Sequence, residues 1–278
     1  TNILDNIQTV SFDEGYTQLF GDTNLMLLSD GKSVHLSLDQ RTGAGFASQD
    51  LYLHGFFSAS IKLPSDYAAG VVVAFYMTNG DLFEKNHDEL DFEFLGNVRG
   101  KEWRVQTNVY GNGSTAVGRE ERFYIDGIPI REIIRNESSM GGAFPSKPMS
   151  LYATIWDGSN WATSGGRYKV NYKFSPYIAK FSDFVLHGCT VNPVDHSSAC
   201  DKAESNNYNT ISLSTKQKYA MQSFRNKYMT YSYCYDRKRY AKPLKECSSN
   251  RRESLKSYRS NGVKLSKRHR RGAGNSAI

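Results

Sequence analysis

Apolar residues at every second position predict β-strands in the first part of the chain. The ranges 34–38 and 57–63 both alternate in this way, and Pro64 ends the second of them. The range 71–76 is apolar almost throughout, which is typical of a strand that is buried on both faces. These patterns predict a series of strands that are joined by turns.

Helical periodicity is missing from the same region. No helix-length pattern with a 3.6-residue period occurs before residue 200. Gly43-Ala44-Gly45 predicts a turn or a bulge rather than a phosphate-binding loop, because no helix pattern follows it. We therefore expect an all-β fold, a β-sandwich that occupies residues 9–190.

A different pattern follows in residues 191–247, which we expect to form a C-terminal extension. Ser214-Thr215-Lys216-Gln217 fits the capping box that begins many helices. Met221, Phe224 and Tyr228 would then lie on one face of a helix of about four turns. The extension is thus predicted to be partly helical.

The stretch 87–97 combines strand alternation with a dense group of acids. Glu89, Asp91 and Glu93 alternate with apolar residues at 90, 92 and 94. A strand with this pattern has one apolar face, which can pack into a core, and one acidic face. Three ionised carboxylates cannot be buried without partners, so we expect the acidic face to line a space that is open to water.

The spacing of these acids suits acid–base chemistry. The α-carbons of Glu89 and Glu93 would lie roughly 13 Å apart on a strand, and each side chain can lean about 4 Å inward. The remaining gap is close to the ~5 Å between the two carboxyl groups of a retaining glycosidase. Asp91 lies between them, and the pKa values of three such neighbours must split. Two alternatives are a solvated acidic face and a calcium loop, although the interleaved apolar residues argue against a loop.

Polar and aromatic side chains on two further strands could contact a carbohydrate. Gln106 and Asn108 share one face of the strand predicted over 104–110, and neutral amides hydrogen-bond sugar hydroxyls without adding charge. Trp156 and Trp161 offer flat faces on which sugar rings stack, although tryptophan also packs well in cores. The residues between the two tryptophans predict a tight turn that exposes at least one indole.

The charge of the chain is distributed unevenly. The formal net charge of the 278 residues is +7, but residues 248–278 alone hold nine Lys and Arg against one acid, Glu253. We expect this tail to be disordered and solvated. Its partner would be a polyanion, either acidic pectin or, in an intracellular chain, nucleic acid. No apolar run reaches the length that spans a membrane, so we expect no membrane partner.

Cysteines and sequons favour an extracellular protein. Four cysteines allow three pairings, of which the local one joins close neighbours, and no metal-binding spacing is present. Two N-x-S sequons are candidate glycosylation sites. Residues 1–8 lack the basic start and the apolar stretch of a signal peptide. The residues concerned are Cys189, Cys200, Cys234 and Cys247, and Asn112 and Asn136.

With these motifs in view, the chain resembles the plant xyloglucan endotransglucosylase/hydrolases, which are retaining glycoside hydrolases with a concanavalin-like jelly-roll fold. The resemblance covers about residues 10–247, and its combination of motifs is specific. It rests on HDELDFEFLGN at 87–97, FDEGY at 12–16, HGFF at 54–57 with IKLP at 61–64, QTN at 106–108, PIR at 129–131, WDGSNWAT at 156–163 and YMTYSYC at 228–234.

The resemblance implies roles for individual residues. Glu89 would be the nucleophile, Glu93 the acid/base, and Asp91 the residue that tunes the pKa values of both. It also implies a disulfide between Cys189 and Cys200 and another between Cys234 and Cys247. The implied substrate-binding residues are Gln106, Asn108, Trp156, Asp157, Trp161 and Gly165.

The resemblance further implies an activity and a location. Such an enzyme cleaves the β-1,4-glucan backbone of xyloglucan and religates it to a xyloglucan acceptor, as part of cell wall biogenesis. It would be a secreted monomeric glycoprotein of the cell wall or apoplast, and it would need no cofactor and no metal.

One departure from the family's pattern lies between Arg122 and Phe123, where about two strands, on the order of 20 to 25 residues, are absent. Loss of strands exposes sheet edges, so we expect weaker activity. One alternative function is therefore a catalytically impaired protein that binds xyloglucan or the cell wall. A lectin-like module and a nucleic-acid-binding protein are two others, which the intact acids and the secretory features respectively argue against.

Overall fold

The computed structural model describes residues 7–115, 121–133, 145–192, 213–238, 240 and 247. The chain forms two compact units: the first comprises residues 1–119 and 141–211, and the second comprises residues 120–140 and 212–278. No described helix is long and apolar enough to cross a membrane.

The first unit contains two β-sheets and very short helices. Its helical elements are α1 (Phe12–Gly15), η2 (Asp22–Asn24) and η3 (Tyr172–Phe174). Its strands are β1 (Tyr16–Phe20), β2 (Leu25–Leu27), β3 (Val34–Leu38), β4 (Ala44–Ser48), β5 (Leu51–Lys62), β6 (Val71–Thr78), β7 (Glu89–Leu95), β8 (Arg104–Gly111), β9 (Ser114–Thr115), β12 (Ser150–Asp157) and β13 (Tyr177–Val191).

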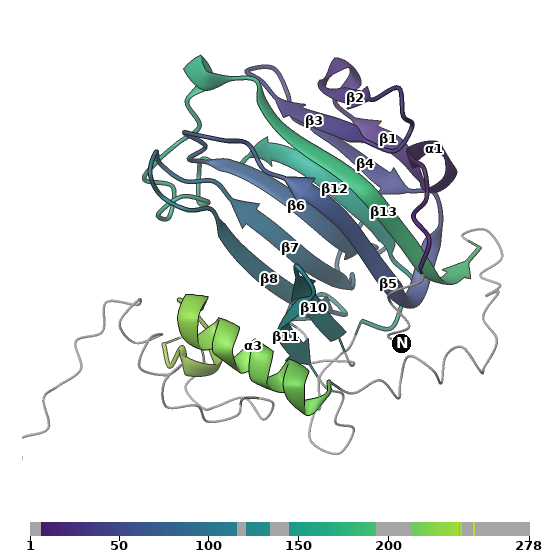
Figure 1. Cartoon of the computed structure of the whole chain (residues 1–278), viewed down its shortest axis with the longest axis vertical. Coiled ribbons are helices and arrows are strands. Elements are labelled where there is room, and N and C mark those ends of the chain that lie inside the picture. Colours follow the sequence, from purple (N-terminus) through teal and green to yellow (C-terminus); the bar gives the residue numbers. More distant parts are fainter. Residues whose placement is uncertain are drawn as a thin grey trace, which may run out of the picture. The chain divides into compact units, whose positions relative to one another are not determined.

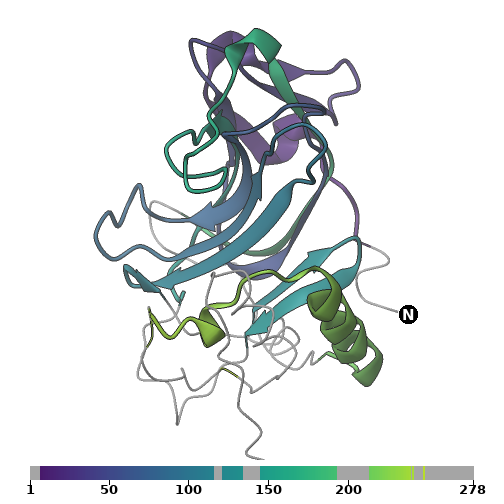
Figure 2. The same cartoon turned by 90° about the vertical axis from the view of Figure 1, so that its left-hand side faces the viewer.

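These strands form a β-sandwich, as the sequence predicts. Seven strands pair in the order β1-β4-β12-β6-β7-β8-β9, and four pair in the order β2-β3-β13-β5. The two sheets lie face to face as two layers in Figures 1 and 2. The core between them contains aromatic and branched side chains from both sheets, including Phe46, Val73 and Phe181.

Three predicted strands are confirmed in detail. The alternating apolar residues Val34, Leu36 and Leu38 of β3 are all buried. Strand β6 is buried on both faces along almost its whole length. Strand β5 ends at Lys62, two residues before Pro64, but begins earlier than the alternation indicates.

Of the two alternatives predicted at Gly43-Ala44-Gly45, a turn is wrong for Ala44 and Gly45, which belong to strand β4, whereas an irregularity of the strand pairing is present opposite Gly45. The glycines are needed because other strands approach closely. A Cβ on Gly43 would lie 2.0 Å from the carbonyl oxygen of Ile155, and one on Gly45 would lie 2.6 Å from the ring of Phe20. The pairing of β1 with β4 is irregular at this point.

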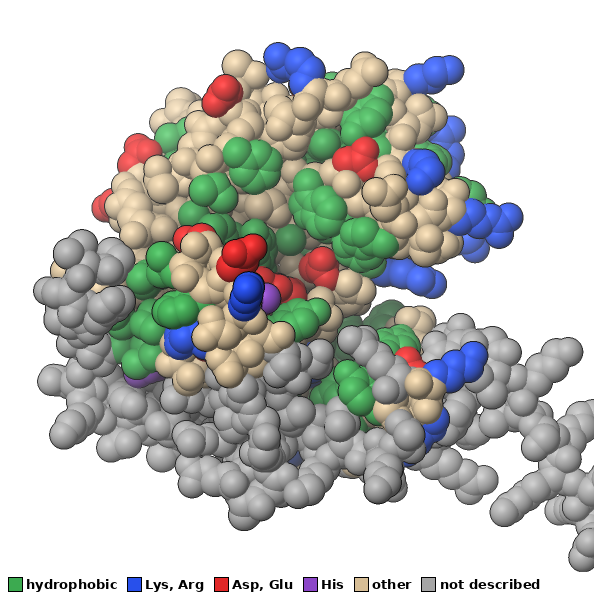
Figure 3. Space-filling model, turned by 180° about the vertical axis from the view of Figure 1, so that it is seen from behind, with side chains coloured by type: hydrophobic (Ala, Val, Ile, Leu, Met, Phe, Trp, Pro, Cys, Tyr) green, Lys and Arg blue, Asp and Glu red, His purple; other side chains and the backbone are tan. Residues whose placement is uncertain are grey.

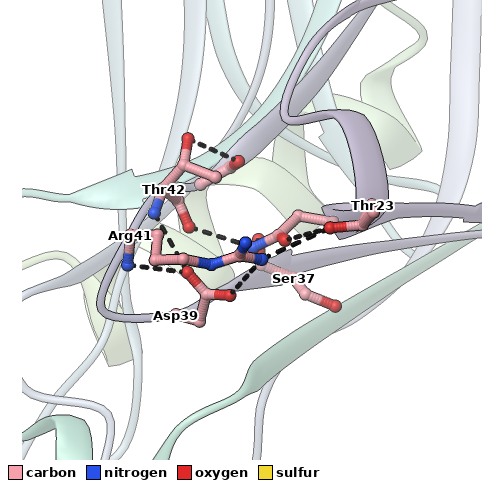
Figure 4. Close-up of polar contacts among 7 residues, drawn as sticks. Thr23, Ser37, Asp39, Arg41 and Thr42 are labelled. Carbon is pink, nitrogen blue, oxygen red and sulfur yellow. Dashed lines mark hydrogen bonds and ion pairs between the residues drawn. The ribbon is translucent and has the colours of Figure 1, made fainter.

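A small polar cluster closes the turn between β3 and β4 (Figure 4). The carboxylate of Asp39 accepts hydrogen bonds from the backbone N–H groups of Arg41 and Thr42, at 2.8 and 3.0 Å. The buried side chain of Asn24 donates to the carbonyl oxygens of Ser37 and Thr42, at 3.2 and 3.0 Å. These contacts give hydrogen-bond partners to backbone groups of the turn that are not paired within a β-sheet.

The second unit contains strands β10 (Glu121–Ile125) and β11 (Ile128–Ile133), helix α3 (Thr215–Tyr228) and the short helix η4 (Tyr233–Tyr235). Helix α3 begins with the predicted capping box of Ser214 and Gln217, and it packs against β11. The predicted disulfide between Cys234 and Cys247 is present. Cys200 lies outside the described residues, so its pairing with Cys189 stays a prediction.

Residues Arg122 and Phe123, where the family pattern is interrupted, are consecutive residues of β10. Among the described strands it pairs with β11 alone, in a two-stranded sheet, and Arg122 forms an ion pair with Glu132 across the hairpin. In the sandwich, β9 is an edge strand of the seven-stranded sheet, and β5 is an edge strand of the four-stranded sheet. The core-facing residues of β7, namely Leu90, Phe92 and Phe94, are only partly buried.

Candidate active site

Strand β7 places the three acids on one face of the seven-stranded sheet. In the strand register, Glu89 lies between Thr78 of β6 and Tyr110 of β8, and the two other acids have partners on the same two strands. Figure 3 shows acidic side chains gathered in a hollow of the surface, with hydrophobic side chains around them. Residues 89–95 form a strand, as predicted. A calcium-binding loop would need a turn at this position.

The carboxylate of Glu93 is held by two amides from the neighbouring strand. The side chains of Gln106 and Asn108 both donate to Oε2 of Glu93, at 2.5 and 2.9 Å. The prediction that these amides lie beside the acids is thus confirmed. Their use as ligands of sugar hydroxyls stays a prediction, because the hydrogen bond that each amide donates here goes to Glu93.

Asp91 is the buried member of the group, with 6% of its surface exposed. Burial and then the negative charges of Glu89 and Glu93 raise the pKa of Asp91 to about 8, although a hydrogen bond from Asn108 acts in the opposite direction. Asp91 is consequently neutral below that pH, and its hydroxyl is hydrogen-bonded to Glu89. The split of pKa values that the sequence predicts is thus present.

Replacing Asp91 with Asn is expected to lower kcat roughly tenfold and to remove the pH dependence that ionisation of Asp91 causes near pH 8. As the pH rises through 8 the parent loses the proton that Asp91 donates to Glu89 and gains a third negative charge, so its rate should fall there. Asparagine cannot ionise, so the rate of the variant should not fall as the pH rises through 8. A pH–rate profile from pH 4 to 9.5 measures both effects, and an unchanged rate and profile would show that Asp91 is merely an alternating strand residue.

Glu89 has neighbours that the sequence analysis did not single out. The Nε2 atom of His87 lies 3.9 Å from Oε2 of Glu89. Burial, followed by the charge of Glu89, raises the pKa of Tyr76, whose ring stacks on that of Tyr152 at a centroid distance of 5.3 Å. These two tyrosines are paired across β6 and β12. Only the register of three strands brings them to the acids, so the alternation of a single strand does not reveal them.

The two tryptophans lie close to one another at the end of β12. Their ring centroids are 5.9 Å apart; Trp161 is 37% exposed, and Trp156 packs against a small cluster of buried residues. The tight turn between them is confirmed by hydrogen bonds from the backbone N–H groups of Trp161 and Ala162 to the carbonyl oxygen of Gly158. At least one indole is therefore exposed, as predicted.

Asp157 and Gly165 lie in the same region. Burial raises the pKa of Asp157, but hydrogen bonds from Ser159 and from the hydroxyl of Tyr172 outweigh it, and the pKa is lowered overall. Asp157 is thus an ionised acceptor. Gly165 has a φ of +68° and no atom within 4 Å of an added Cβ, so it lies in open space.

Of the two sequons, Asn112 lies in the described part of the chain and Asn136 lies outside it. Asn112 is exposed in the turn between β8 and β9, with a φ of +51°. No group of His, Cys, Asp and Glu side chains in the described residues has an arrangement that could hold a metal ion.

Taken as chemistry, this face of the sandwich offers two carboxyl side chains on one strand with a neutral acid between them. That arrangement, on a β-sandwich, suits the paired-carboxylate chemistry of a glycoside hydrolase. The family model of glycosyl hydrolases family 16 matches residues 12–123 and 118–174, and the model of the xyloglucan endo-transglycosylase (XET) C-terminus matches residues 202–247.

Curated proteins and solved structures give further matches. "Probable xyloglucan endotransglucosylase/hydrolase protein 27" of Arabidopsis thaliana is 58% identical, over 90% of this chain and 83% of the relative. "Xyloglucan endotransglucosylase/hydrolase protein 2" of the same plant is 40% identical, over 87% and 90%. Among solved structures, a prokaryotic β-1,3-1,4-glucanase (lichenase) derived from a mouse hindgut metagenome is 18% identical over 64% of this chain and 97% of that chain, with a TM-score of 0.46. The chain belongs to the xyloglucan endotransglucosylase/hydrolase family.

The match to protein 27 also bears on the interruption at Arg122. The alignment is 276 residues long, but only 90% of this 278-residue chain, about 250 residues, takes part in it. The aligned stretch of the relative is therefore longer than the aligned stretch of this chain. The family 16 model likewise matches in two segments that meet at residues 118–123. Both observations agree with a segment that is absent between Arg122 and Phe123.

Proposed function

We propose that this chain cleaves the β-1,4-glucan backbone of xyloglucan and religates the fragment to a xyloglucan acceptor. The observation that carries the proposal is the group of Glu89, Asp91 and Glu93 on one face of β7, with Asp91 buried and neutral between the two others. Membership in the family supports the choice of xyloglucan, which the matched relatives carry in their names.

The first half-reaction requires the protonated form of Glu93: the carboxylate of Glu89 attacks the anomeric carbon of the donor while Glu93 gives its proton to the glycosidic oxygen. The glycosidic bond breaks, and the donor fragment becomes an ester of Glu89. The hydrogen bond from neutral Asp91 fixes the attacking carboxylate. The amides of Gln106 and Asn108 fix the carboxyl group of Glu93.

In the second half-reaction, Glu93 removes the proton from an acceptor hydroxyl, whose oxygen attacks the same anomeric carbon. The ester bond to Glu89 breaks, and two inversions give retention of configuration overall. A sugar acceptor gives transfer, and water gives hydrolysis. The ratio between the two depends on how much binding energy the acceptor side supplies. Trp156, Asp157, Trp161 and Gly165 are proposed to bind the sugar chain.

The direct test incubates the chain with xyloglucan and a fluorescently labelled xyloglucan oligosaccharide, followed by size separation. We expect the label to move into high-mass polymer, and we expect no such movement when the xyloglucan donor is left out. Binding of xyloglucan by the folded chain without incorporation of label or new reducing ends would instead establish a wall-binding protein.

We further propose that the protein is a secreted monomer of the cell wall or apoplast, glycosylated at Asn112 and Asn136. The disulfide between Cys234 and Cys247 supports an oxidising compartment, and the exposed position of Asn112 suits a glycan. Mass spectrometry of the protein from its native source, before and after removal of N-glycans, tests the glycosylation. An unchanged mass would contradict it.

The basic tail, residues 248–278, is proposed to bind acidic wall polysaccharide. Removing it should weaken retention on pectin-rich wall material, most strongly at low salt, because such charge contacts are screened over about 10 Å at 0.1 M salt. Retention is measured by elution with a salt gradient. Retention that does not depend on salt, or that survives the removal, would show that the tail is merely solvated.

A further inference from the structure

Asp88, the residue directly before Glu89, is fully buried, with 0% of its surface exposed. Its carboxylate accepts four hydrogen bonds. Oδ1 accepts from the backbone N–H of Asn112 at 2.8 Å and from the ammonium of Lys147 at 2.9 Å. Oδ2 accepts from the backbone N–H groups of Ser146 and Lys147, at 2.6 and 2.8 Å. Its environment thus differs from that of the three acids on β7.

The backbone of Asp88 is fixed as well. Its N–H donates to Oδ1 of Asn79 at 2.8 Å, and its carbonyl oxygen accepts from the hydroxyl of Thr78 at 3.2 Å. Asn79 is also 0% exposed, and its amide donates to the carbonyl oxygen of Pro148 at 3.0 Å. Asp88 and Asn79 therefore join the end of β6, the start of β7, the turn between β8 and β9, and the segment that leads into β12.

These contacts require a carboxylate and not simply a polar side chain. All four partners of the Asp88 oxygens are donors, so an amide of the same shape would turn its own N–H₂ group towards a donor. Burial raises the pKa of Asp88, but the backbone N–H groups and the Lys147 ammonium outweigh it and lower the pKa overall. The group is an ionised, fully paired buried charge, and loss of one partner from such a pair is costly.

We propose that Asp88 is a further residue that positions the nucleophile of this enzyme, and that it acts by fixing the first residue of β7 against three neighbouring segments. The inference rests on the proposed role of Glu89. Glu89 is the first residue of β7. The hydrogen bonds between strands fix the chain that follows Glu89, and Asp88 fixes the chain that precedes it. Two of the tied segments, at Asn112 and at Ser146, also flank the interrupted region in sequence. The Asp88 carboxylate thus joins the start of β7 to chain segments on both sides of that region.

The test uses the full chain with three substitutions. Asp88→Asn removes the charge and sets an N–H₂ group against two donors, because each oxygen of Asp88 accepts two hydrogen bonds. Lys147→Met keeps the two backbone donors at residues 146 and 147 but removes the ammonium. Asn24→Ala is the matched control, because it deletes two hydrogen bonds that a buried side chain of η2 donates to the carbonyl oxygens of Ser37 and Thr42. Melting temperature, kcat and KM for transfer, and the pKa of Asp91 by carbon-13 NMR are measured for each.

The Asp91 titration reports where Glu89 lies, whether or not the chain turns over substrate. The ionisable groups that act on Asp91 are Glu89 and Glu93 on the same strand and Tyr76 on β6. If Glu89 loses its fixed position, its charge acts less on Asp91, and the pKa of Asp91 should fall from about 8 in both Asp88→Asn and Lys147→Met. A purely electrostatic effect of Lys147→Met would instead raise that pKa, because a positive charge is removed.

The proposal predicts a lower pKa of Asp91 in both variants and the parent value in Asn24→Ala. It also predicts that kcat falls roughly tenfold or more in Asp88→Asn with KM little changed, because small displacements of a reacting group are costly. Any other pattern of the Asp91 pKa overturns the proposal. In particular, a variant with a lower melting temperature but with the Asp91 pKa of the parent would show that Asp88 only stabilises the fold. Should the parent show no turnover, the proposed function fails on its own and the titration still decides this inference.

Discussion

Replacing Glu89 with Gln is expected to reduce xyloglucan turnover by a factor of about 10,000 or more, as losses of a catalytic nucleophile do elsewhere. The amide keeps the shape of the carboxylate but cannot attack the anomeric carbon, so no ester forms. Binding of xyloglucan should change little, since the substitution keeps the shape of the side chain and leaves the other proposed sugar-binding residues in place. Turnover of polymer and binding by calorimetry on the same preparation measure the two effects.

The matched comparison is Glu93→Gln, in which the nucleophile remains and the proton donor is lost. Both half-reactions should slow, but an activated aryl glycoside needs no proton for departure of its leaving group, so the ester should still form. Added azide should then release the sugar, because a small anion needs no general base. Equal turnover of Glu89→Gln and the parent would contradict the assignment of the nucleophile.

Inserting the family's two-strand segment between Arg122 and Phe123 is expected to raise transfer activity by up to about 100-fold, since displacement of reacting groups by about 1 Å can cost that much. In this chain β10 runs through the junction, and within the part of the chain that the structure describes it pairs only with β11, in a separate sheet. The core-facing side chains of β7 are only partly buried. Further strands would cover them, fix the sheet that carries the acids and raise the melting temperature.

An insertion of the same length, rich in Gly and Ser, is the control for chain length alone, and it should give no gain. Transfer between xyloglucan chains and thermal unfolding are compared for the three forms. Equal activity of the parent and the strand-containing form, together with a cooperative melt of the parent, would show that the sandwich needs no further strands.

The sequence predicts those features of the site that depend on the alternation within a single strand. Alternation places Glu89, Asp91 and Glu93 on one face, and the same pattern on the next strand places Gln106 and Asn108 there too. The contact of both amides with Glu93 depends on the register between β7 and β8, which the alternation does not define. For the same reason Tyr76 and Tyr152 escape sequence analysis.

Long-range polar contacts and close packing are the other limits. Asp88 reads as one more acid in an acidic stretch, and its burial depends on donors that lie 24 and about 60 positions away in the sequence. Gly45 reads as a turn signal, but it is a strand residue that Phe20 and Thr154 approach closely. By contrast, the capping box of Ser214 and Gln217 is a local pattern, and it predicts the start of α3 correctly.

The most direct test of the account is to trap the glycosyl–enzyme ester. A xyloglucan oligosaccharide with a 2-deoxy-2-fluoro donor sugar and an activated leaving group slows the second half-reaction more than the first, so the ester should accumulate. Proteolysis and mass spectrometry then locate the added sugar. The account predicts one sugar chain, attached to Glu89, in the parent and in Glu93→Gln, and none in Glu89→Gln. Attachment to Glu93 or Asp91, or release of the leaving group without an adduct, would contradict it.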